Sequence, residues 1–216
     1  MGRVLLLRSC RSDMTSRGGF QWPESGPVEC PDWNDRPECG GGLHGLLLGQ
    51  QDPGVWYDDG KVIAFEAEPE DVIDLGGKAK ARRGVVVYCG DMAGASAYFA
   101  ANGGAEGLHR RIVIGGDRST LTGGYGSTLT GGDRSTLTGG NGSTLTGGNK
   151  STLTGGDWST LTGGNGSTLT SGNGSTLAFF WWDGRRRLVV GYVGENGITP
   201  NTPHRLNAAG EITEAR

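Results

Sequence analysis

Residues 115–178 repeat one pattern of eight residues, Ser-Thr-Leu-Thr-Gly-Gly-x-x, with a single leucine at the third position. Within Ser-Thr-Leu-Thr the inward and outward positions alternate, which is typical of a short β-strand with one buried face. Leucine and serine would point inward and both threonines outward, while Gly-Gly and the variable pair would form a turn. Seven full copies begin at Ser119, Ser127, Ser135, Ser143, Ser151, Ser159 and Ser167, and a truncated eighth begins at Ser175.

Eight residues are too few to form a strand and return beneath it, so one coil needs two octapeptides. The variable pairs support this period, because Arg118, Arg134 and Lys150 recur in every second octapeptide and would share one edge. The opposite edge would carry mainly glycine turns, with Trp158 as the exception. The sequence therefore predicts a flattened, parallel β-solenoid of about four 16-residue coils.

The outward threonines would form a regular lattice on each face of this solenoid. Neighbouring coils lie ~4.8 Å apart and residues i and i+2 of a strand ~6.7 Å apart. Threonine is stiff at χ1, so the hydroxyl and methyl groups would be preorganised, and we expect such a surface to order water or bind ice. The predicted water-binding residues are Thr120, Thr122, Thr128, Thr130, Thr136, Thr138, Thr144, Thr146, Thr152, Thr154, Thr160, Thr162, Thr168 and Thr170.

Residues 179–216 have the pattern expected of an end cap. One leucine per strand gives a thin core, so the array needs serine and asparagine hydrogen-bond ladders and covered ends. The apolar run 179–182 leads into Asp183-Gly184, a hairpin signal, and residues 185–193 would return as a strand. With the basic edge and Trp158, Phe180 and Trp182 are predicted to take part in self-association.

Residues 1–114 predict a small α+β domain of unknown function. The runs 4–8, 61–67 and 84–89 are strand candidates, and residues 92–101 form a predicted helix with Asp91 as its N-cap. Between the first two strands, residues 18–51 read as a long loop region rich in Trp, Pro and Gly. The run 108–114 would lead a strand directly into the repeat. The whole chain is thus predicted to be mainly β, with domains at 1–114, 115–178 and 179–216.

Charge and composition exclude several classes of function. The formal net charge is −3, and three basic and three acidic residues make the repeat neutral, which argues against a nucleic-acid partner. No run approaches the ~20 apolar residues of a membrane-spanning helix. The apolar run near the start is too short for a signal peptide, which predicts a cytoplasmic location. The repeat also lacks the carboxylates of a calcium-binding solenoid, and no cofactor is expected.

A few residues of the first domain are of types that can bind a metal ion or take part in catalysis. Cys30, Cys39, His44 and Cys89 are zinc-ligand types, but their spacing matches no common ligand pattern, so we expect reduced thiols and a structural histidine. The alternative, a ligand-binding or catalytic His44, stays open because glycines flank it closely. Asp58, Asp59, Glu66, Glu68, Glu70 and Asp71 form an acidic cluster that we interpret as a solvated surface. Without a nucleophile–base pair or a phosphate-binding loop, the sequence predicts no enzyme.

The repeat and the cap together resemble a known family. The resemblance rests on Gly116-Asp-Arg-Ser-Thr-Leu-Thr-Gly, on residues 172–177 and 179–184, on Gly194-Glu-Asn-Gly-Ile-Thr and on Pro203-His-Arg-Leu. These segments are similar to bacterial ice nucleation proteins. The resemblance implies water-organising Thr-x-Thr ladders, basic coils that promote assembly with the cap, and a cell-surface or outer-membrane location. Gly18-Gly-Phe and Gly42-Leu-His-Gly resemble an uncharacterised bacterial and phage domain that precedes tandem repeats, which implies no activity.

Two functions of different classes follow from this sequence. The first is an ice-binding or ice-nucleating β-solenoid that orders water on its threonine ladders after self-assembly. The second is a structural repeat that multimerises or presents the N-terminal domain without acting on ice. A third and weaker hypothesis makes the N-terminal domain an enzyme or metal binder that uses His44 and the cysteines.

Overall fold

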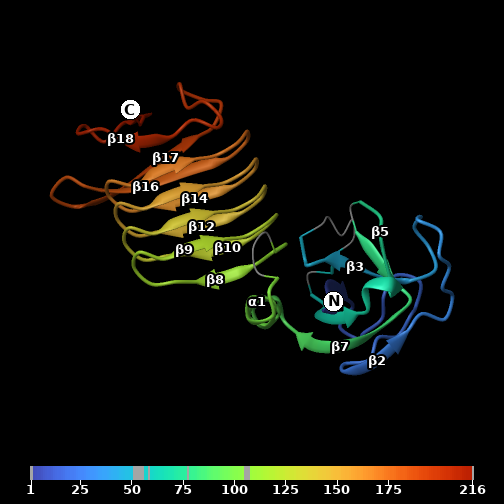
Figure 1. Cartoon of the computed structure of the whole chain (residues 1–216). Helices are drawn as coiled ribbons and strands as arrows, with labels where there is room; N and C mark the ends of the chain where they lie inside the picture. Colours follow the sequence, from blue (N-terminus) through green and yellow to red (C-terminus); the bar gives the residue numbers. More distant parts are fainter. Residues whose placement is uncertain (1, 51–55, 58, 77, 105–107, 216) are drawn as a thin grey trace. The chain divides into compact units, whose positions relative to one another are not determined.

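The computed structural model describes residues 2–50, 56–57, 59–76, 78–104 and 108–215. The chain divides into two compact units, Met1–Leu108 and His109–Arg216. The first unit is built mainly on one antiparallel sheet, and the second is a parallel β-solenoid with a C-terminal cap (Figure 1). The predicted fold class, mainly β with a small α+β region before the solenoid, is confirmed.

The sheet of the N-terminal unit has seven strands in the order β2-β7-β4-β1-β3-β6-β5. Its centre is the pair β1–β4, which is in register over seven positions from Val4↔Ala67 to Cys10↔Lys61. The strands are β1 (Val4–Cys10), β2 (Gly26–Glu29), β3 (Leu43–Leu47), β4 (Lys61–Ala67), β5 (Val72–Asp74), β6 (Ala79–Ala81) and β7 (Arg83–Gly90), and a 3-10 helix η1 (Pro69–Asp71) precedes β5.

Both faces of this sheet are covered, which explains why β1 is apolar over consecutive positions. Leu6 packs into a cluster with Trp22 and Phe65 on one face. Leu5 and Leu7 pack into a second cluster with Phe99 of helix α1 (Met92–Ala101) on the other face. The helix begins as predicted, because the Asp91 side chain accepts a hydrogen bond from the backbone N–H of Gly94 at 2.8 Å.

The interpretation of residues 18–51 as one long loop region is wrong for two segments. Strand β2 pairs with β7, and β3 pairs with β1 and β6. Each strand is short and contains Gly or Pro, so the local pattern carries a weak strand signal. Pairing to neighbours distant in the sequence supplies the stability that local propensity lacks.

The C-terminal unit contains two six-stranded sheets, and the strands from β8 to β16 alternate between them along the chain. In each sheet the parallel strands pair with a shift of two octapeptides, as in Thr144↔Thr160 and Thr136↔Thr152, which confirms the predicted coil. The first sheet holds β8 (Ile112–Ile114), β10 (Thr128–Thr130), β12 (Thr144–Gly147), β14 (Thr160–Gly163), β16 (Thr176–Trp182) and β17 (Arg186–Tyr192). The second holds β9 (Thr120–Thr122), β11 (Thr136–Thr138), β13 (Thr152–Thr154), β15 (Thr168–Thr170), β18 (His204–Leu206) and β19 (Ile212–Glu214).

The interior of the solenoid is a stack of leucines flanked by serines. Leu129 and its equivalents through Leu177 are fully buried, and the serines from Ser127 to Ser175 that precede them are buried too. These serines bond to neighbouring coils: the N–H of Ser143 donates to Ser159 Oγ at 3.2 Å, and its Oγ donates to Gly124 O at 3.3 Å. A buried hydroxyl without a partner would be costly, so this ladder is what makes serine tolerable inside.

The corners are stabilised by a second ladder of Asp and Asn side chains. The N–H of Asn149 donates to Asp133 Oδ1 at 2.7 Å, and that of Asp133 donates to Asp117 Oδ1 at 2.9 Å. The Gly-Gly pair is required by close packing at these corners. A Cβ on Gly139 would lie 2.7 Å from the Cβ of Ser143, and one on Gly164 would lie 2.6 Å from the backbone N of Asn149.

Strands outside the octapeptides extend the first sheet at the start of the solenoid and both sheets at its end. Strand β8 pairs with β10, one coil before Leu129, so it forms the first rung of the first sheet, whereas the second sheet begins with β9 of the first octapeptide. At the other end, β16 and β17 form the predicted antiparallel hairpin around Asp183-Gly184. Strands β18 and β19, which the sequence pattern did not indicate, extend the second sheet through the pair Leu169↔His204.

Candidate functional site: two threonine faces

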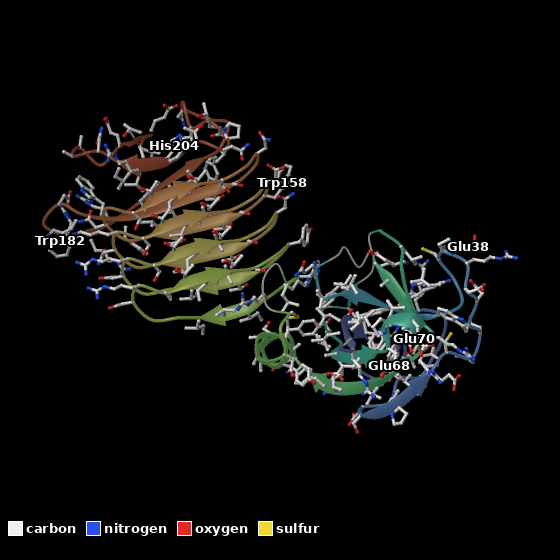
Figure 2. The ribbon with its side chains drawn as sticks, viewed as in Figure 1. Glu38, Glu68, Glu70, Trp158, Trp182 and His204 are labelled. Carbon is white, nitrogen blue, oxygen red and sulfur yellow. The ribbon has the colours of Figure 1, made fainter. Side chains whose placement is uncertain are left out.

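The threonines of the repeat lie on the outer surface of both sheets. Because leucine and serine point inward, each strand presents its Thr-x-Thr pair outward (Figure 2). None of these threonines is buried. The first threonine face belongs to the first sheet and consists of Thr128, Thr130, Thr144, Thr146, Thr160, Thr162 and Thr176. The second threonine face belongs to the second sheet and consists of Thr120, Thr122, Thr136, Thr138, Thr152, Thr154, Thr168 and Thr170.

Each face is a two-dimensional lattice rather than a set of scattered hydroxyls. On the first face Thr144 pairs directly with Thr128 and Thr160, so like side chains stack from coil to coil. The spacing is ~4.8 Å between coils and ~6.7 Å along a strand. The lattice carries no charged side chain, because charged residues of the repeat occupy only the variable pairs.

The lattice is rigid for reasons visible in the backbone. Thr144 N donates to Ser127 O at 2.8 Å, and Thr160 N donates to Ser143 O at 2.9 Å, so every strand is tied to its neighbour. The inner serine ladder and the corner ladder fix the same coils from the other sides. With χ1 restricted by β-branching, the positions of the methyl and hydroxyl groups are defined before any ligand arrives.

The two threonine faces end differently. The first face is continued by Ile112 and Ile114 of β8, and Ile114 is 81% exposed. At the cap end the same face continues with Ala178, Val190 and Tyr192. The second face continues at the cap with β18 and its exposed Arg205. The sequence pattern did not assign the two isoleucines to this face, because they precede the octapeptides. Their offset of 16 residues from Thr128 and Thr130, one full coil, is the signal that could have placed them there.

The basic residues of the variable pairs occupy positions that favour glycine. Arg118, Arg134 and Lys150 have φ of 59°, 59° and 57°, and Trp158 on the opposite edge has φ of 59°. A left-handed conformation costs a residue with a Cβ roughly 1–2 kcal/mol. Four such residues therefore stand where other copies place glycine, at a cost to stability.

Five of the six predicted assembly residues lie along one edge of the unit. The hairpin β16–β17 runs beside the basic edge, where a groove of about 480 Å³ is lined by Phe180, Trp181 and Trp182 together with Asn149 and Asn165. The guanidinium of Arg186 lies 3.9 Å from the ring centre of Phe180. Trp158, 74% exposed, lies at the opposite edge from Trp182 (Figure 2).

The structure keeps the candidate zinc ligands apart. Cys30 contacts Asp32, Cys89 contacts the sulfur of Met14, and Cys39 is exposed. Across the described residues, no three His, Cys, Asp or Glu side chains gather as a ligand set for a metal ion. The four cysteines are free thiols.

The acidic cluster of the first unit is divided among ion pairs. Arg3 pairs with Glu68 at 2.9 Å and lies 3.8 Å from Glu66, while Asp71 accepts from Arg83 at 2.7 Å. Asp58 lies outside the described residues. These carboxylates serve local pairing instead of forming one cation site.

His44 makes the stability of the first unit depend on pH, and the surroundings of its ring determine the sign of this dependence. Burial, followed by Lys78, Arg8 and Lys80, lowers the pKa of His44 to about 4 from 6.5. The unfolded chain therefore binds a proton between pH 6.5 and about 4 that the folded chain does not. We expect this contribution to stability to be present above pH 6.5 and to be lost as the pH falls through that window.

The measurement compares urea unfolding of the first unit at pH 7 and pH 5 in wild type and in His44→Gln. Amide hydrogen exchange in β1 and β4 reports on this unit alone, whereas tryptophan fluorescence would mix the two units, since three of the six tryptophans lie in the second. The wild type should lose more stability on acidification than the variant. Equal losses in the two proteins would show that His44 does not titrate in this way.

Comparison with known proteins connects this geometry to a function class. A stretch of 107 residues, 46% of the chain, is 46% identical to "Ice nucleation protein" of Xanthomonas campestris pv. translucens. A stretch of 105 residues, 47% of the chain, is 46% identical to "Ice nucleation protein" of Pseudomonas syringae. "Ice nucleation protein InaU" of Pantoea ananas is 33% identical over 41% of the chain. This chain is similar to bacterial ice nucleation proteins.

These ice nucleation relatives are far longer than this chain, which spans only 7–9% of their length. Residues 4–96 match a separate family, "Domain of unknown function (DUF7666)". No solved structure was found to match the chain. Among the described residues, no helix is long and apolar enough to cross a membrane.

Proposed function

We propose that the C-terminal unit is an ice-binding module that orders water on its two threonine faces. The observation that carries the proposal is the in-register stacking of Thr-x-Thr pairs, coil upon coil, in both sheets. Hydroxyls at a fixed spacing offer hydrogen bonds to a water layer, while the methyl groups between them favour an ordered layer over a random one. The similarity to ice nucleation proteins supports this assignment.

The size of the faces defines what a single copy can do. The second threonine face has four rows and the first has three complete rows and a fourth with Thr176 alone, so each spans roughly 15 Å along the solenoid. We infer that one copy binds ice, and that efficient nucleation needs several copies whose faces combine into a larger template. Self-association is thus part of the proposed function.

Three features support association through the basic edge and the cap. Arg118, Arg134 and Lys150 are kept at positions where glycine would cost less. The adjacent hairpin exposes Trp182, Leu188 and Tyr192, which is unusual for the surface of a single unit. The aromatic groove beside the basic edge would hold part of a second copy.

A charge-reversal variant tests both the association of copies and its effect on the freezing of water. We expect Arg118→Glu plus Arg134→Glu to reduce the particle size measured by light scattering and to lower the droplet freezing temperature. Glutamate and arginine both carry a Cβ, so the backbone strain at these two positions stays the same and only the charge changes.

The matched control is Lys61→Glu plus Arg82→Glu, which makes the same charge change at two exposed residues of the first unit. This control should assemble and freeze water as the wild type does. An unchanged particle size in the test variant would remove the basic edge from the interface. A wild type without effect on freezing or on ice recrystallisation would show that the proposed function is wrong and would favour a purely structural repeat.

A further inference from the structure

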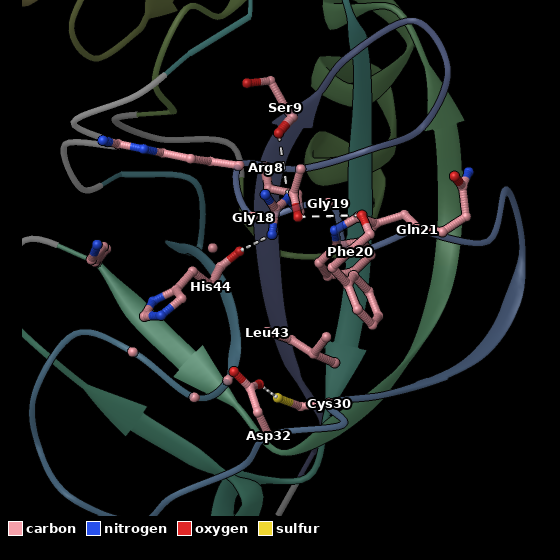
Figure 3. A pocket seen from close by; sticks show the side chains of 18 of the residues that line it. Arg8, Ser9, Gly18, Gly19, Phe20, Gln21, Cys30, Asp32, Leu43 and His44 are labelled. Atoms are coloured by element: carbon pink, nitrogen blue, oxygen red, sulfur yellow. Dashed lines mark hydrogen bonds between the residues drawn. The ribbon is translucent and has the colours of Figure 1, made fainter.

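The N-terminal unit contains a pocket of about 850 Å³, large enough for a small-molecule ligand. It is walled by β1, by the segment around Phe20, by the segment after β2 and by β3 with the glycines that precede it (Figure 3). All of these walls belong to the unit that matches the domain of unknown function. The pocket takes no part in the threonine faces.

Two glycine segments shape the mouth of this pocket. Gly18 and Gly19 have φ of 98° and 82°, and Gly40 has φ of 119°. Side chains rarely adopt these values, so glycine is the residue that fits there. A Cβ on Gly41 would lie 2.5 Å from Nδ2 of Asn34, so the second segment is closely packed as well. Because glycine has no side chain, a ligand can approach the main chain of these segments closely.

The charge inside the pocket is unbalanced. Among the described residues, Arg8, Arg17 and Lys78 line it, whereas Asp32 is the single carboxylate of the lining. That carboxylate already accepts a hydrogen bond from the Cys30 thiol at 2.8 Å. In the part of the chain that the structure describes, no carboxylate pairs with any of the three cations.

Arg8 is the most unusual of these cations. Its guanidinium lies 4.4 Å from the ring centre of the buried Trp22 and donates to His44 O at 3.0 Å and to Ser9 O at 3.3 Å (Figure 3). Burial lowers the pKa of Arg8 to about 10, because carbonyl groups and a ring stabilise a cation less than a carboxylate does. A desolvated cation without a counter-ion is costly to the fold, and a bound anion would offset that cost.

One further cation lies next to the glycine segment of the lining. Lys80 of β6 is fully buried and donates from Nζ to Asn34 Oδ1 at 3.0 Å and to Gly40 O at 3.5 Å. The hydrogen bond to Gly40 O holds the backbone of the glycine segment that precedes β3. After burial, the main causes that lower the pKa of His44 are the charges of Lys78, Arg8 and Lys80. The electrostatic potential around His44 is therefore positive.

The wall beside Arg8 is apolar. The Trp22 ring that Arg8 covers packs edge to face against Phe20, with the ring centres 5.5 Å apart, and Leu43 also lines the pocket. The pocket thus places an aromatic and aliphatic surface next to a cation. The chemical reactivity is low, because burial and Asp32 raise the pKa of the Cys30 thiol to about 11 and keep it protonated near neutral pH. These properties favour a binding site over a catalytic one.

We propose that this pocket binds a small molecule in which an oxyanion, phosphate or carboxylate, is attached to an aromatic or apolar group. Arg8, Lys78 and Arg17 hold the oxyanion, and Phe20 and Leu43 contact the apolar group. The guanidinium of Arg8 suits either anion, because its donors match two oxygens at once. The site is independent of the ice-binding proposal and adds a second function to the chain.

The test uses the full chain and three probes of matched shape: phenyl phosphate, benzoate and neutral benzyl alcohol. Isothermal titration calorimetry measures affinity, and the NMR signal of the His44 ring reports on the site. We expect phenyl phosphate or benzoate to bind, to raise the pKa of His44 and to raise the unfolding temperature of the first unit. Benzyl alcohol should bind at least about tenfold more weakly, a difference of 1.4 kcal/mol.

Two variants and a control locate the binding. Arg8→Gln should abolish anion binding, but Arg8 is half-buried against Trp22 in the central strand β1, so the same change could also destabilise the unit. Arg17→Ala plus Lys78→Ala alters side chains outside the core, so it should weaken the anion without unfolding the unit. Arg82→Ala removes an exposed charge away from the pocket and should leave binding unchanged.

The outcomes separate cleanly. Binding of phenyl phosphate alone identifies a phosphorylated ligand, and binding of benzoate alone identifies a carboxylic acid. Absence of binding for both anions, or affinities in the Arg17/Lys78 variant equal to those of wild type, would overturn the proposal. Ice activity is measured separately on the same samples, so loss of one function leaves the other interpretable.

Discussion

Replacing Thr144 and Thr146 with lysine is expected to remove most of the ice activity of the first threonine face. These residues lie in its central complete row, between Thr128/Thr130 and Thr160/Thr162. Two long charged side chains would project from the lattice, hold disordered water and divide the face into rows too small to act together. We expect the ice affinity of this face to fall by about tenfold or more, equivalent to 1.4 kcal/mol, so that the activity left in an ice recrystallisation assay comes from the second face.

The matched variant is Thr152→Lys plus Thr154→Lys, which makes the same change on the second threonine face. If both faces bind ice, each pair lowers activity in part and the fourfold variant removes it. Circular dichroism should report an intact solenoid in all three, because these side chains point to solvent. A folded fourfold variant with wild-type ice activity would exclude the threonine faces as the binding surface.

Leu145→Ala is expected to cause the largest loss of stability. Leu145 is fully buried in the middle of the leucine stack and has Leu129 and Leu161 above and below it. Truncation of a buried leucine costs about 2–5 kcal/mol, because the transfer energy is lost and a cavity remains. Each coil has only two leucines, and no other large side chain can move into the space.

Amide hydrogen exchange in β12 and β14 measures this effect locally, without assuming that the two units unfold together. Protection of these strands should fall in Leu145→Ala while the first unit keeps its protection. Leu188→Ala is the control, since Leu188 is 55% exposed and its truncation should cost less than about 0.5 kcal/mol. Equal protection in wild type and Leu145→Ala would mean that the hydrogen-bond ladders, rather than the leucines, hold the coils together.

Each threonine face of this chain has at most four rows. The chain spans less than a tenth of the length of its ice nucleation relatives. Under our proposal the missing area is supplied by association between copies. The exposed apolar side chains at the two ends of the first threonine face, Ile114 and Tyr192, are consistent with contacts between copies along that face.

The sequence by itself determined the repeat unit in detail. Alternation within Ser-Thr-Leu-Thr put Leu145 inside and Thr144 and Thr146 outside, and the spacing of Arg118, Arg134 and Lys150 determined a coil of two octapeptides. This worked because a solenoid couples each residue to its own copy one coil away, so a linear period becomes a spatial one. The strand β4 and the helix with its Asp91 cap were also predictable, since both depend on local signals.

Only the tertiary structure decided which segments close the sheets and which side chains meet. Strands β2, β3, β18 and β19 are short, and long-range pairing rather than local propensity defines them. The groove beside the basic edge forms because the β16–β17 hairpin folds back along Asn149 and Asn165. In the first unit, Arg8, His44 and Lys78 are far apart in the sequence and share no motif. Antiparallel pairing of β1, β3 and β6 brings them to one pocket, and no pattern along the chain encodes that convergence.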